Sequence, residues 1–365
     1  MAMTQIILLC RQGFEAETAA EIQDLSSEAG CFGYCKTQKN QGYVSFFAED
    51  HQLKQLVEHV SFRRLIFTRQ WFVCGDALEL SGTDRVSEIL ENMDGIPHCG
   101  EVEIIHTDTN EGKELSRLCR SLTGPLAATL RKKNKLSAKR NSKIPRLMLL
   151  FLDGQQVHIG FHFTNNACKW PDGILHLKSP KDAPSRSTLK LEEAWHWFVP
   201  KRQWGQRIAA GMRAVDLGAA PGGWTWQLVK RSMMVEAIDN GPMKGDLMET
   251  GQVTHHMVDG FKFSPSKKAH WMVCDMAEAP IKVAERMAHW VVNDWCAETI
   301  FNLKLPMKKR HAEVKACIEL MEEKFAQAEI EVEMGFKHLY HDREEITCHI
   351  RRIYHRNNDR LDYED

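Results

Sequence analysis

The chain has 365 residues, enough for two or three domains, and its 48 Lys and Arg against 49 Asp and Glu exclude an overall basic field. Eleven scattered cysteines without paired Cys-x-x-Cys spacing predict reduced thiols and no zinc site. The sequence lacks both a basic leader and an apolar run of about 20 residues, so we expect a cytoplasmic protein without membrane contact.

The first half of the chain alternates strand and helix patterns, which is typical of a mixed α+β fold. We expect a hairpin around Asp153-Gly154, a dipeptide that favours tight turns, between strands at 146–152 and 155–163. The other strands are expected at 4–10, 42–47, 65–73 and 101–107, and the helices at 14–29, 52–60, 85–92 and 113–131.

A basic segment lies near the end of this half. From Arg131 to Arg146 the sequence carries eight basic residues and no acidic one. Such a run is either a solvated loop or a loop that contacts nucleic-acid phosphates without reading sequence. For the second alternative, the candidate phosphate-binding residues are Lys132, Lys133, Lys139 and Arg140.

A proline-bearing segment from Asn165 to Pro184 connects the two halves, and we place the linker at 169–184. The pattern that follows indicates a mostly parallel sheet with helices on both faces, a Rossmann-like α/β domain at 185–365. Strands are expected at 212–217, 233–238, 253–258, 270–274, 299–303, 329–333 and 346–351, and helices from 224, at 281–292 and at 309–327.

The most informative stretch is Ala214-Val-Asp-Leu-Gly-Ala-Ala-Pro-Gly-Gly-Trp-Thr-Trp226. An apolar strand passes through a Gly/Pro turn into a helix, which is the opening of a nucleotide-binding unit. The glycine spacing matches neither the dinucleotide fingerprint nor the phosphate-binding loop with its lysine. The glycines could form only a tight turn, or they could let a ligand approach the backbone at the helix N-terminus.

Polar residues also follow successive predicted strands. Asp216, Asp239, Asp259, Asp275 and Lys304 all lie at or just past strand ends. Ligands of open α/β sheets bind outside the carboxyl ends of the strands. Asp239 follows the glycine turn by roughly twenty residues, where such folds hold ribose hydroxyls. The pattern therefore predicts one ligand site at this edge.

Four residues and their surroundings resemble a known family. Lys190 lies in Ser185-Arg-Ser-Thr-Leu-Lys-Leu, Asp275 in Val-Cys-Asp-Met-Ala, Lys304 in Phe-Asn-Leu-Lys and Glu345 in Arg-Glu-Glu-Ile-Thr. Their types and order, with Asp-Leu-Gly-Ala-Ala-Pro-Gly-Gly-Trp between the first two, resemble the RNA ribose 2'-O-methyltransferases with a Lys-Asp-Lys-Glu tetrad. The resemblance covers Pro184 to Arg352 and leaves Glu344 as an alternative to Glu345.

The resemblance implies S-adenosylmethionine as cofactor and no metal. Gly218 and Ala220-Pro221-Gly222-Gly223 would pass beneath its methionine part, with Ser187 at the carboxylate. Asp239 would take the ribose hydroxyls and Asp259 would face the adenine. Asp275 would lie beside the methyl donor.

A ribose 2'-hydroxyl is a weak acid, so the enzyme must align it with the methyl group and remove its proton. The resemblance makes Lys304 the general base, and this base must be a neutral amine to accept the proton. Asp275 would orient Lys304. Glu345 would balance the charge of Lys190 and help to place the ribose. A surface network of two ion pairs is the plain alternative.

The whole chain is similar to bacterial members that methylate a cytidine 2'-hydroxyl of 23S rRNA and that carry an N-terminal RNA-binding THUMP region. This similarity implies a ferredoxin-like segment at 1–60, a THUMP-like domain at 61–168 and 23S rRNA as partner. Lys308, Lys309 and Arg310, just beyond Lys304, would hold RNA phosphates. Alternatives are another RNA such as tRNA, or a non-catalytic RNA-binding protein of ribosome assembly.

Overall fold

The computed structural model describes residues 3–354 and divides the chain into two compact units. The first unit ends at His176 and the second begins at Leu177, inside the proline-bearing segment. Each unit has its own sheet and its own core.

The first unit is a mixed α+β fold. Its strands are β1 (Gln5–Leu9), β2 (Tyr34–Lys36), β3 (Tyr43–Phe47), β4 (Gln70–Cys74), β5 (Leu78–Glu79), β6 (Glu101–His106), β7 (Arg146–Phe151) and β8 (Gln156–His162). Its helices are α1 (Glu15–Glu28), α2 (Asp50–His59), α3 (Arg85–Glu91), α4 (Asn110–Glu114) and α5 (Ser116–Lys132), with short 3₁₀ turns η1 (Phe62–Arg64) and η2 (Thr164–Asn166).

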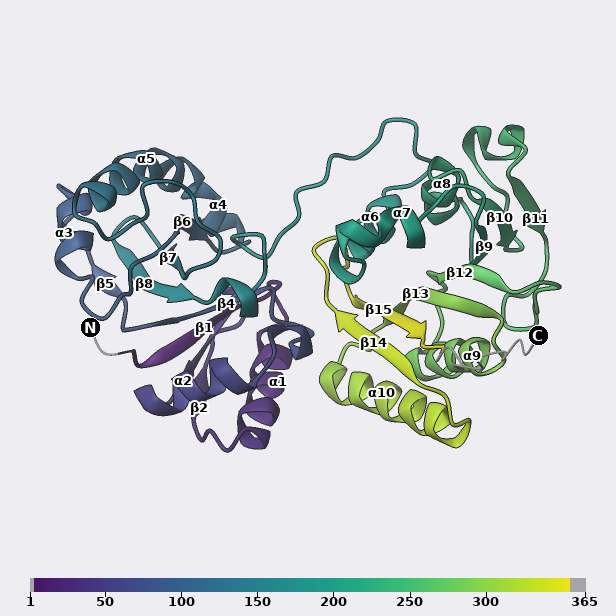
Figure 1. Ribbon diagram of the computed structural model, residues 1–365, viewed down its shortest axis with the longest axis horizontal. Helices are drawn as coiled ribbons and strands as arrows, with labels where there is room; N and C mark the ends of the chain where they lie inside the picture. Colours follow the sequence, from purple (N-terminus) through teal and green to yellow (C-terminus); the bar gives the residue numbers. More distant parts are fainter. Residues whose placement is uncertain (1–2, 355–365) are drawn as a thin grey trace, which may run out of the picture. The chain divides into compact units, whose positions relative to one another are not determined.

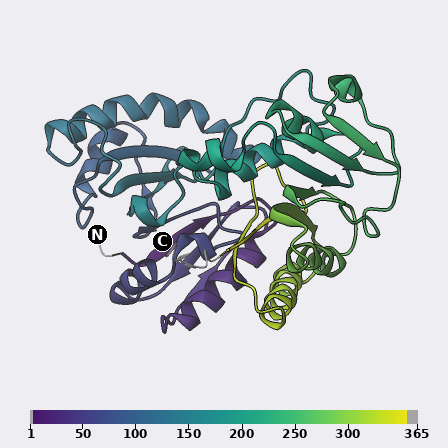
Figure 2. The same ribbon diagram turned by 45° about the vertical axis from the view of Figure 1, so that its right-hand side comes forward.

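A single sheet in the order β2-β3-β1-β4-β8-β7-β6 runs through this unit, with β5 paired to β8. Among the strands that the structure describes in this unit, β6 and β7 pair in parallel and the other pairs are antiparallel. Helices α1 and α2 lie on one side of the strands and α5 on the other (Figure 1, Figure 2). Strands from the expected ferredoxin-like segment (1–60) and from the segment that follows it (61–168) therefore belong to one sheet.

In this unit the start of one predicted strand was wrong, and two short strands, β2 and β5, were not predicted. The strand expected at 65–73 begins at Gln70, because Leu65 and Phe67 are buried in a connecting segment after η1. The three-residue strand β2 was not predicted, and it pairs with β3 at the sheet edge. Strands this short lack the length needed for a readable alternation.

The second unit is an α/β fold. Its strands are β9 (Arg213–Leu217), β10 (Met234–Ile238), β11 (Val253–His256), β12 (Ala269–Cys274), β13 (Cys296–Lys304), β14 (Val332–Lys337) and β15 (Glu345–Arg352). Its helices are α6 (Thr188–Phe198), α7 (Trp204–Arg207), α8 (Gly223–Lys230), α9 (Pro280–Val292) and α10 (Arg310–Gln327), with 3₁₀ turns η3 (Lys201–Gln203) and η4 (Gly245–Thr250).

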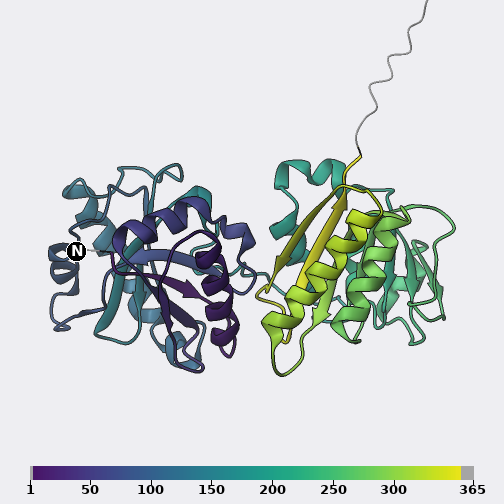
Figure 3. The ribbon, with the colours of Figure 1, turned by 90° about the horizontal axis from the view of Figure 1, so that it is seen from below.

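The sheet of this unit has the order β11-β10-β9-β12-β13-β15-β14. The first five strands are parallel, and β15 is antiparallel to both β13 and β14. Helices α6 and α8 cover one face, and α9 and α10 cover the other (Figure 1, Figure 3). The expected Rossmann-like sheet with helices on both faces is confirmed.

Apolar residues explain why α6 packs where it does. Leu191, Ala194 and Trp195 are fully buried and join the core beneath the sheet face shared with α8. This helix was not predicted, and the strand expected at 329–333 lies instead at Val332–Lys337. Within residues 3–354 no helix is long and apolar enough to span a bilayer.

Candidate active site

Sheet register brings two of the tetrad residues together. Lys304 ends β13 and is the direct partner of Glu345, the first residue of β15. Directly opposed residues of antiparallel strands have neighbouring side chains on the same face. Asp275 follows β12, the parallel neighbour of β13, and Lys190 comes from α6. Four separate elements therefore supply the cluster.

All four side chains are in contact. Lys304 Nζ lies 2.5 Å from Asp275 Oδ1 and 3.9 Å from Glu345 Oε1. Lys190 Nζ lies 3.3 Å from Asp275 Oδ2 and also contacts Glu345 Oε1. Lys304 is the most accessible member, with its side chain 28% exposed, whereas Lys190 is 13% exposed. The cluster is therefore a recessed site with one amine nearer to solvent, which makes it unlike an open surface network.

The two amines differ in their electrostatic surroundings. Burial lowers the pKa of Lys190, but the nearby carboxylates of Asp275 and Glu345 outweigh burial and leave this pKa raised. Lys190 therefore stays an ammonium at neutral pH and is the wrong lysine to accept a proton. Lys304 is the more accessible of the two amines.

The structure also separates the two adjacent glutamates. Glu345 points into the cluster and its side chain is 8% exposed, whereas the side chain of Glu344 is 61% exposed and pairs with Arg310 at 2.5 Å. Glu344 lies just before β15 and pairs with Arg310, so of the two glutamates only Glu345 faces the lysines. The structure places Glu345 there.

A hydrogen-bonded residue that was not predicted lies beneath Asp275. Asn302 Nδ2 donates to Asp275 Oδ1 over 3.0 Å, and Asn302 is fully buried. It lies two residues before Lys304 on β13 and so shares its face of the sheet. That period-two spacing was the available signal for including it.

The glycine turn lies where the strand order reverses. The chain goes outward from β9 to β10 and β11, and then returns to β12 on the other side of β9. Open α/β sheets bind ligands at such a switch point. The ends of β9 and β12 are close, because a Cβ on Gly218 would come within 2.5 Å of Met276 Cγ. The predicted cofactor turn and Asp275, which precedes Met276, are thus adjacent at the switch point.

Two further glycines of the turn are required sterically. Gly222 has φ +110°, and a Cβ there would lie 2.3 Å from Leu247 Cδ1. A Cβ on Gly223 would lie 2.2 Å from Ser187 Oγ. The turn, the start of α8 and the segment before α6 are therefore packed together, which places Ser187 at the turn.

The predicted ribose-binding residue also shapes this turn. Asp239 Oδ2 accepts a hydrogen bond from the Ala220 backbone N–H at 3.0 Å, and Oδ1 accepts one from Gly241 at 2.7 Å. A carboxylate has about four lone-pair positions, so two remain for ligand hydroxyls. The peptide bond between Ala220 and Pro221 is cis.

Asp259, at the end of the neighbouring strand, is exposed and accepts a hydrogen bond from the Phe261 N–H at 2.9 Å. Asp216, at the end of β9, is instead buried beneath the turn and accepts a hydrogen bond from Thr225 Oγ1 at 2.6 Å. Desolvation raises the pKa of Asp216 to about 7. Its position suits a structural role beneath the turn, not contact with a ligand.

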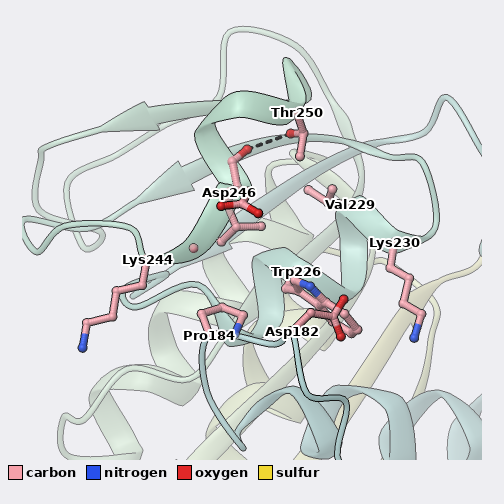
Figure 4. A pocket seen from close by; sticks show the side chains of 10 residues that line it. Asp182, Pro184, Trp226, Val229, Lys230, Lys244, Asp246 and Thr250 are labelled. Atoms are coloured by element: carbon pink, nitrogen blue, oxygen red, sulfur yellow. Dashed lines mark hydrogen bonds between the residues drawn. The ribbon is translucent and has the colours of Figure 1, made fainter.

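A cavity of about 300 Å³ lies behind the glycine turn (Figure 4). Leu247, which limits the space at Gly222, also lines this cavity. Figure 4 shows Trp226, Pro184 and Asp182 close together, whereas Lys230 and Lys244 point away from them. None of the expected cofactor residues lines it.

The expected RNA-binding residues form two sets. Lys132, Lys133, Lys139 and Arg140 are exposed on the first unit. Arg140 pairs with Glu101 Oε1 at 2.6 Å. Lys308 and Lys309 are exposed beyond β13, while Arg310 is 16% exposed and paired with Glu344.

Family models match three parts of the chain. The model described as "RlmM ferredoxin-like domain" matches residues 3–72, and "Ribosomal RNA large subunit methyltransferase M, N-terminal" matches 84–163. The model described as "FtsJ-like methyltransferase" matches 183–342.

Relatives align along almost the whole chain. "Ribosomal RNA large subunit methyltransferase M" of Photorhabdus asymbiotica is 49% identical, covering 98% of this chain and 100% of the relative. The protein of the same name from Aliivibrio salmonicida is also 49% identical, covering 96% and 98%. The chain belongs to the ribosomal RNA large subunit methyltransferase M family. The resemblance to RNA methyltransferases is thereby confirmed at the level of the family.

Solved structures are similar only at a low level. The fibrillarin pre-rRNA processing protein of Methanococcus jannaschii is 12% identical with a TM-score of 0.30, covering 40% of this chain and 69% of that one. This likeness adds nothing to the family assignment. Among residues 3–354 of this family member, no group of three or more His, Cys, Asp or Glu could hold a metal ion.

Proposed function

We propose that this methyltransferase transfers a methyl group from S-adenosylmethionine to the ribose 2'-hydroxyl of a cytidine in 23S rRNA. The observation that carries the proposal is the contact of Lys190, Asp275, Lys304 and Glu345 in one recess beside the strand-order reversal. The names of its relatives support ribosomal RNA as the substrate class.

The residues at the switch point fit the cofactor. The turn is neutral, carries no lysine and approaches Met276 closely through Gly218, which suits a ligand without phosphates. Asp239 and Asp259, at the ends of adjacent strands, would take its ribose and adenine. The turn Ala220–Gly223, with Ser187, would hold its methionine part. When bound, S-adenosylmethionine supplies a methyl group activated by the sulfonium.

The protein then has two tasks, to align the 2'-oxygen and to take its proton. Lys304 would accept the proton at Nζ, since it is the more accessible amine and Lys190 remains an ammonium. Asp275 would hold Lys304 through the 2.5 Å contact. Lys190 and Glu345 would place the ribose. A positioned general base contributes roughly 10²- to 10⁴-fold, so alignment supplies the rest.

The first unit would capture the RNA, with a THUMP-like domain at 61–168 after a ferredoxin-like segment at 1–60. Its exposed basic residues Lys132, Lys133 and Lys139 would contact phosphates, and Lys308 and Lys309 would do so near the site. Arg140 and Arg310 already pair with acids and would exchange those partners for phosphate. Binding would occur before or during large-subunit assembly.

The test is to incubate the protein with labelled S-adenosylmethionine and, separately, naked 23S rRNA, whole large subunits and tRNA. The label is then mapped by the resistance of a 2'-O-methylated nucleotide to alkaline cleavage. The proposal expects label at one cytidine of 23S rRNA. Label in tRNA would favour the alternative substrate, label on a base would refute ribose chemistry, and no label with any RNA would favour a non-catalytic protein.

A further inference from the structure

A chain of buried polar side chains continues from the tetrad into the protein interior. Asn302 Nδ2 donates to Asp275 Oδ1 over 3.0 Å, and Thr347 Oγ1 lies 2.9 Å from Asn302 Oδ1. Thr347 Oγ1 also lies 2.9 Å from Asp342 Oδ2 and 3.1 Å from Oδ1. Asn302, Thr347 and Asp342 are all fully buried. None was expected from the sequence to serve the site.

The number of available protons determines which group donates and which accepts in each of these hydrogen bonds. Asp275 accepts from both lysines, so the amide group of Asn302 must present Nδ2 to it and Oδ1 to Thr347. Thr347 has one hydroxyl proton, which Asn302 Oδ1 requires. The remaining contact of Thr347 is therefore satisfied only when Asp342 donates, which requires a protonated carboxyl.

The surroundings of Asp342 agree with that count. Its carboxyl is fully buried, and desolvation, together with the charges of Glu345 and Glu193, raises its pKa well above the usual range, although Lys190 opposes this. Asp342 Oδ2 accepts the Leu339 N–H at 2.9 Å. One oxygen is thus an acceptor and the other is free to carry the proton.

We propose that Asp342, Thr347 and Asn302 are positioning residues that form a one-way hydrogen-bond relay, from a neutral carboxylic acid to Asp275, and so fix the carboxylate that holds Lys304. The effect of this relay on methyl transfer rests on the proposed function. The sheet register builds it, because Asn302 and Thr347 are direct partners on β13 and β15, two residues along from the Lys304 and Glu345 pair.

The test compares near-isosteric variants of the full chain. Asp342→Asn keeps a donor and an acceptor, so its kcat should stay within about threefold of wild type. Thr347→Val removes the hydroxyl and should lower kcat at least about tenfold with little change in KM for RNA, and Thr347→Ser should restore it. Equal damage from Asp342→Asn and Thr347→Val, or full activity of Thr347→Val, would overturn the relay.

An infrared readout separates the relay from the proposed function. At pH 8 the difference spectrum of wild type minus Asp342→Asn should contain the C=O stretch of a protonated carboxyl. A carboxylate band instead would overturn the relay, whether or not the protein methylates RNA, and even if Thr347→Val failed to fold. Absence of methyl transfer by the wild type, with the protonated band present, would refute the proposed function alone.

A different observation concerns the edge of the first unit's sheet. Tyr34 is 55% exposed on β2 and stacks on Phe47 of β3, with ring centroids 5.2 Å apart and planes at 14°. Lys36 Nζ lies 4.9 Å from the Phe47 ring centroid, and Phe32 is 72% exposed just before the strand. Cys35 faces the other way, since its Sγ contacts Ala19 O of α1. The stacked rings of Tyr34 and Phe47 therefore lie on the sheet face opposite α1.

Charge identifies the kind of partner. Residues 29–48 contain Lys36 and Lys39 and no Asp or Glu. Exposed aromatic rings beside cations at a sheet edge give the bases of single-stranded RNA a surface on which to stack. The geometry points to a second RNA contact, in which unpaired bases stack on Phe32 and Tyr34 beside Lys36. This inference also rests on the proposed RNA substrate.

The test uses a single-stranded decamer carrying 5-iodouridine, cross-linked by light to the full chain and mapped by peptide. Cross-links should fall at residues 32–36, and Phe32→Ala with Tyr34→Ala should weaken decamer binding about tenfold or more. Phe163→Ala, at a 40% exposed ring elsewhere in the unit, is the matched control and should change little. Unchanged binding, cross-links elsewhere, or loss of self-association in place of RNA binding would overturn the inference.

Discussion

At the scale of single residues, the site depends on which way each side chain points. Lys190 and Lys304 touch the same two carboxylates, but the side chain of Lys190 is 13% exposed and that of Lys304 is 28% exposed. The carboxylates outweigh burial at Lys190 and raise its pKa. Two lysines of the same type thus acquire different roles from their surroundings, one as a fixed charge and one as the proposed base.

The adjacent glutamates provide a matched pair for testing this arrangement. Glu345→Gln removes the charge that contacts Lys190 and should lower kcat at least about tenfold, because it removes the ion pair that we propose places the ribose. Glu344→Gln removes an exposed charge paired with Arg310 and should change kcat by less than about twofold. Steady-state methyl transfer to 23S rRNA measures both variants. Equal effects would contradict the assignment of Glu345.

At the scale of elements, Asp216 at the end of β9 accepts a hydrogen bond from Thr225 of α8 and so connects the two elements that flank the turn. Burial raises the pKa of this carboxyl from the usual 3.8 to about 7, so the folded protein disfavours its ionised form. The stability contribution of the protonated form is fully present below about pH 4. It is lost as pH rises towards 7 and changes little above that pH.

Asp216→Asn should therefore gain stability relative to wild type as pH rises from about 4 to 7. The gain is at most about 1.4 kcal/mol per pH unit, because one unit of pKa shift corresponds to that free energy. Chemical denaturation of both proteins across this range measures it. Asp182→Asn, at an exposed position, should show no such trend. A stability difference for Asp216→Asn that does not vary with pH would refute the raised pKa.

Elements also show how far sequence reasoning reaches. The strand–turn–helix at 214–226 was predictable from its glycines. Gly218, Gly222 and Gly223 occupy positions where a side chain would clash, so the fold requires glycine there. Helix α6, which carries Lys190, was not predicted, although its apolar residues Leu191, Ala194 and Trp195 follow a helical spacing. The four tetrad positions were predicted from a resemblance. Asn302 was within reach of the sequence through its spacing of two residues from Lys304, whereas Asp342 lies outside both strands and connects to the site only through Thr347 in the folded structure.

At the scale of the whole molecule, the near-zero net charge means that RNA capture must rely on local patches. The basic residues expected to do this lie in both units, at 132–140 and at 308–310. The two units also have separate sheets and cores. Binding and chemistry should therefore be separable by mutation.

Replacing Lys132, Lys133, Lys139 and Arg140 with Gln should raise KM for 23S rRNA about tenfold or more and leave kcat nearly unchanged. The slope of log KM against log salt should also fall, by up to about 0.9 for each phosphate that the variant no longer neutralises. Kinetics at several salt concentrations measure both. Neutralising Lys54 and Lys282, which pair with the nearby acids Asp50 and Glu278, is the control. A quadruple variant with wild-type KM and salt slope would show that the segment is only a solvated loop.

The most direct measurement of the central proposal is single-turnover methyl transfer by Lys304→Ala, with saturating S-adenosylmethionine and 23S rRNA. Calorimetry should show cofactor affinity within about threefold of wild type, while the transfer rate falls roughly 10²- to 10⁴-fold, the range expected for losing a positioned base. Lys267→Ala, at an exposed lysine of the same unit with no proposed role, should keep the single-turnover rate within about threefold. A Lys304→Ala protein that transfers methyl at the wild-type rate would contradict the account.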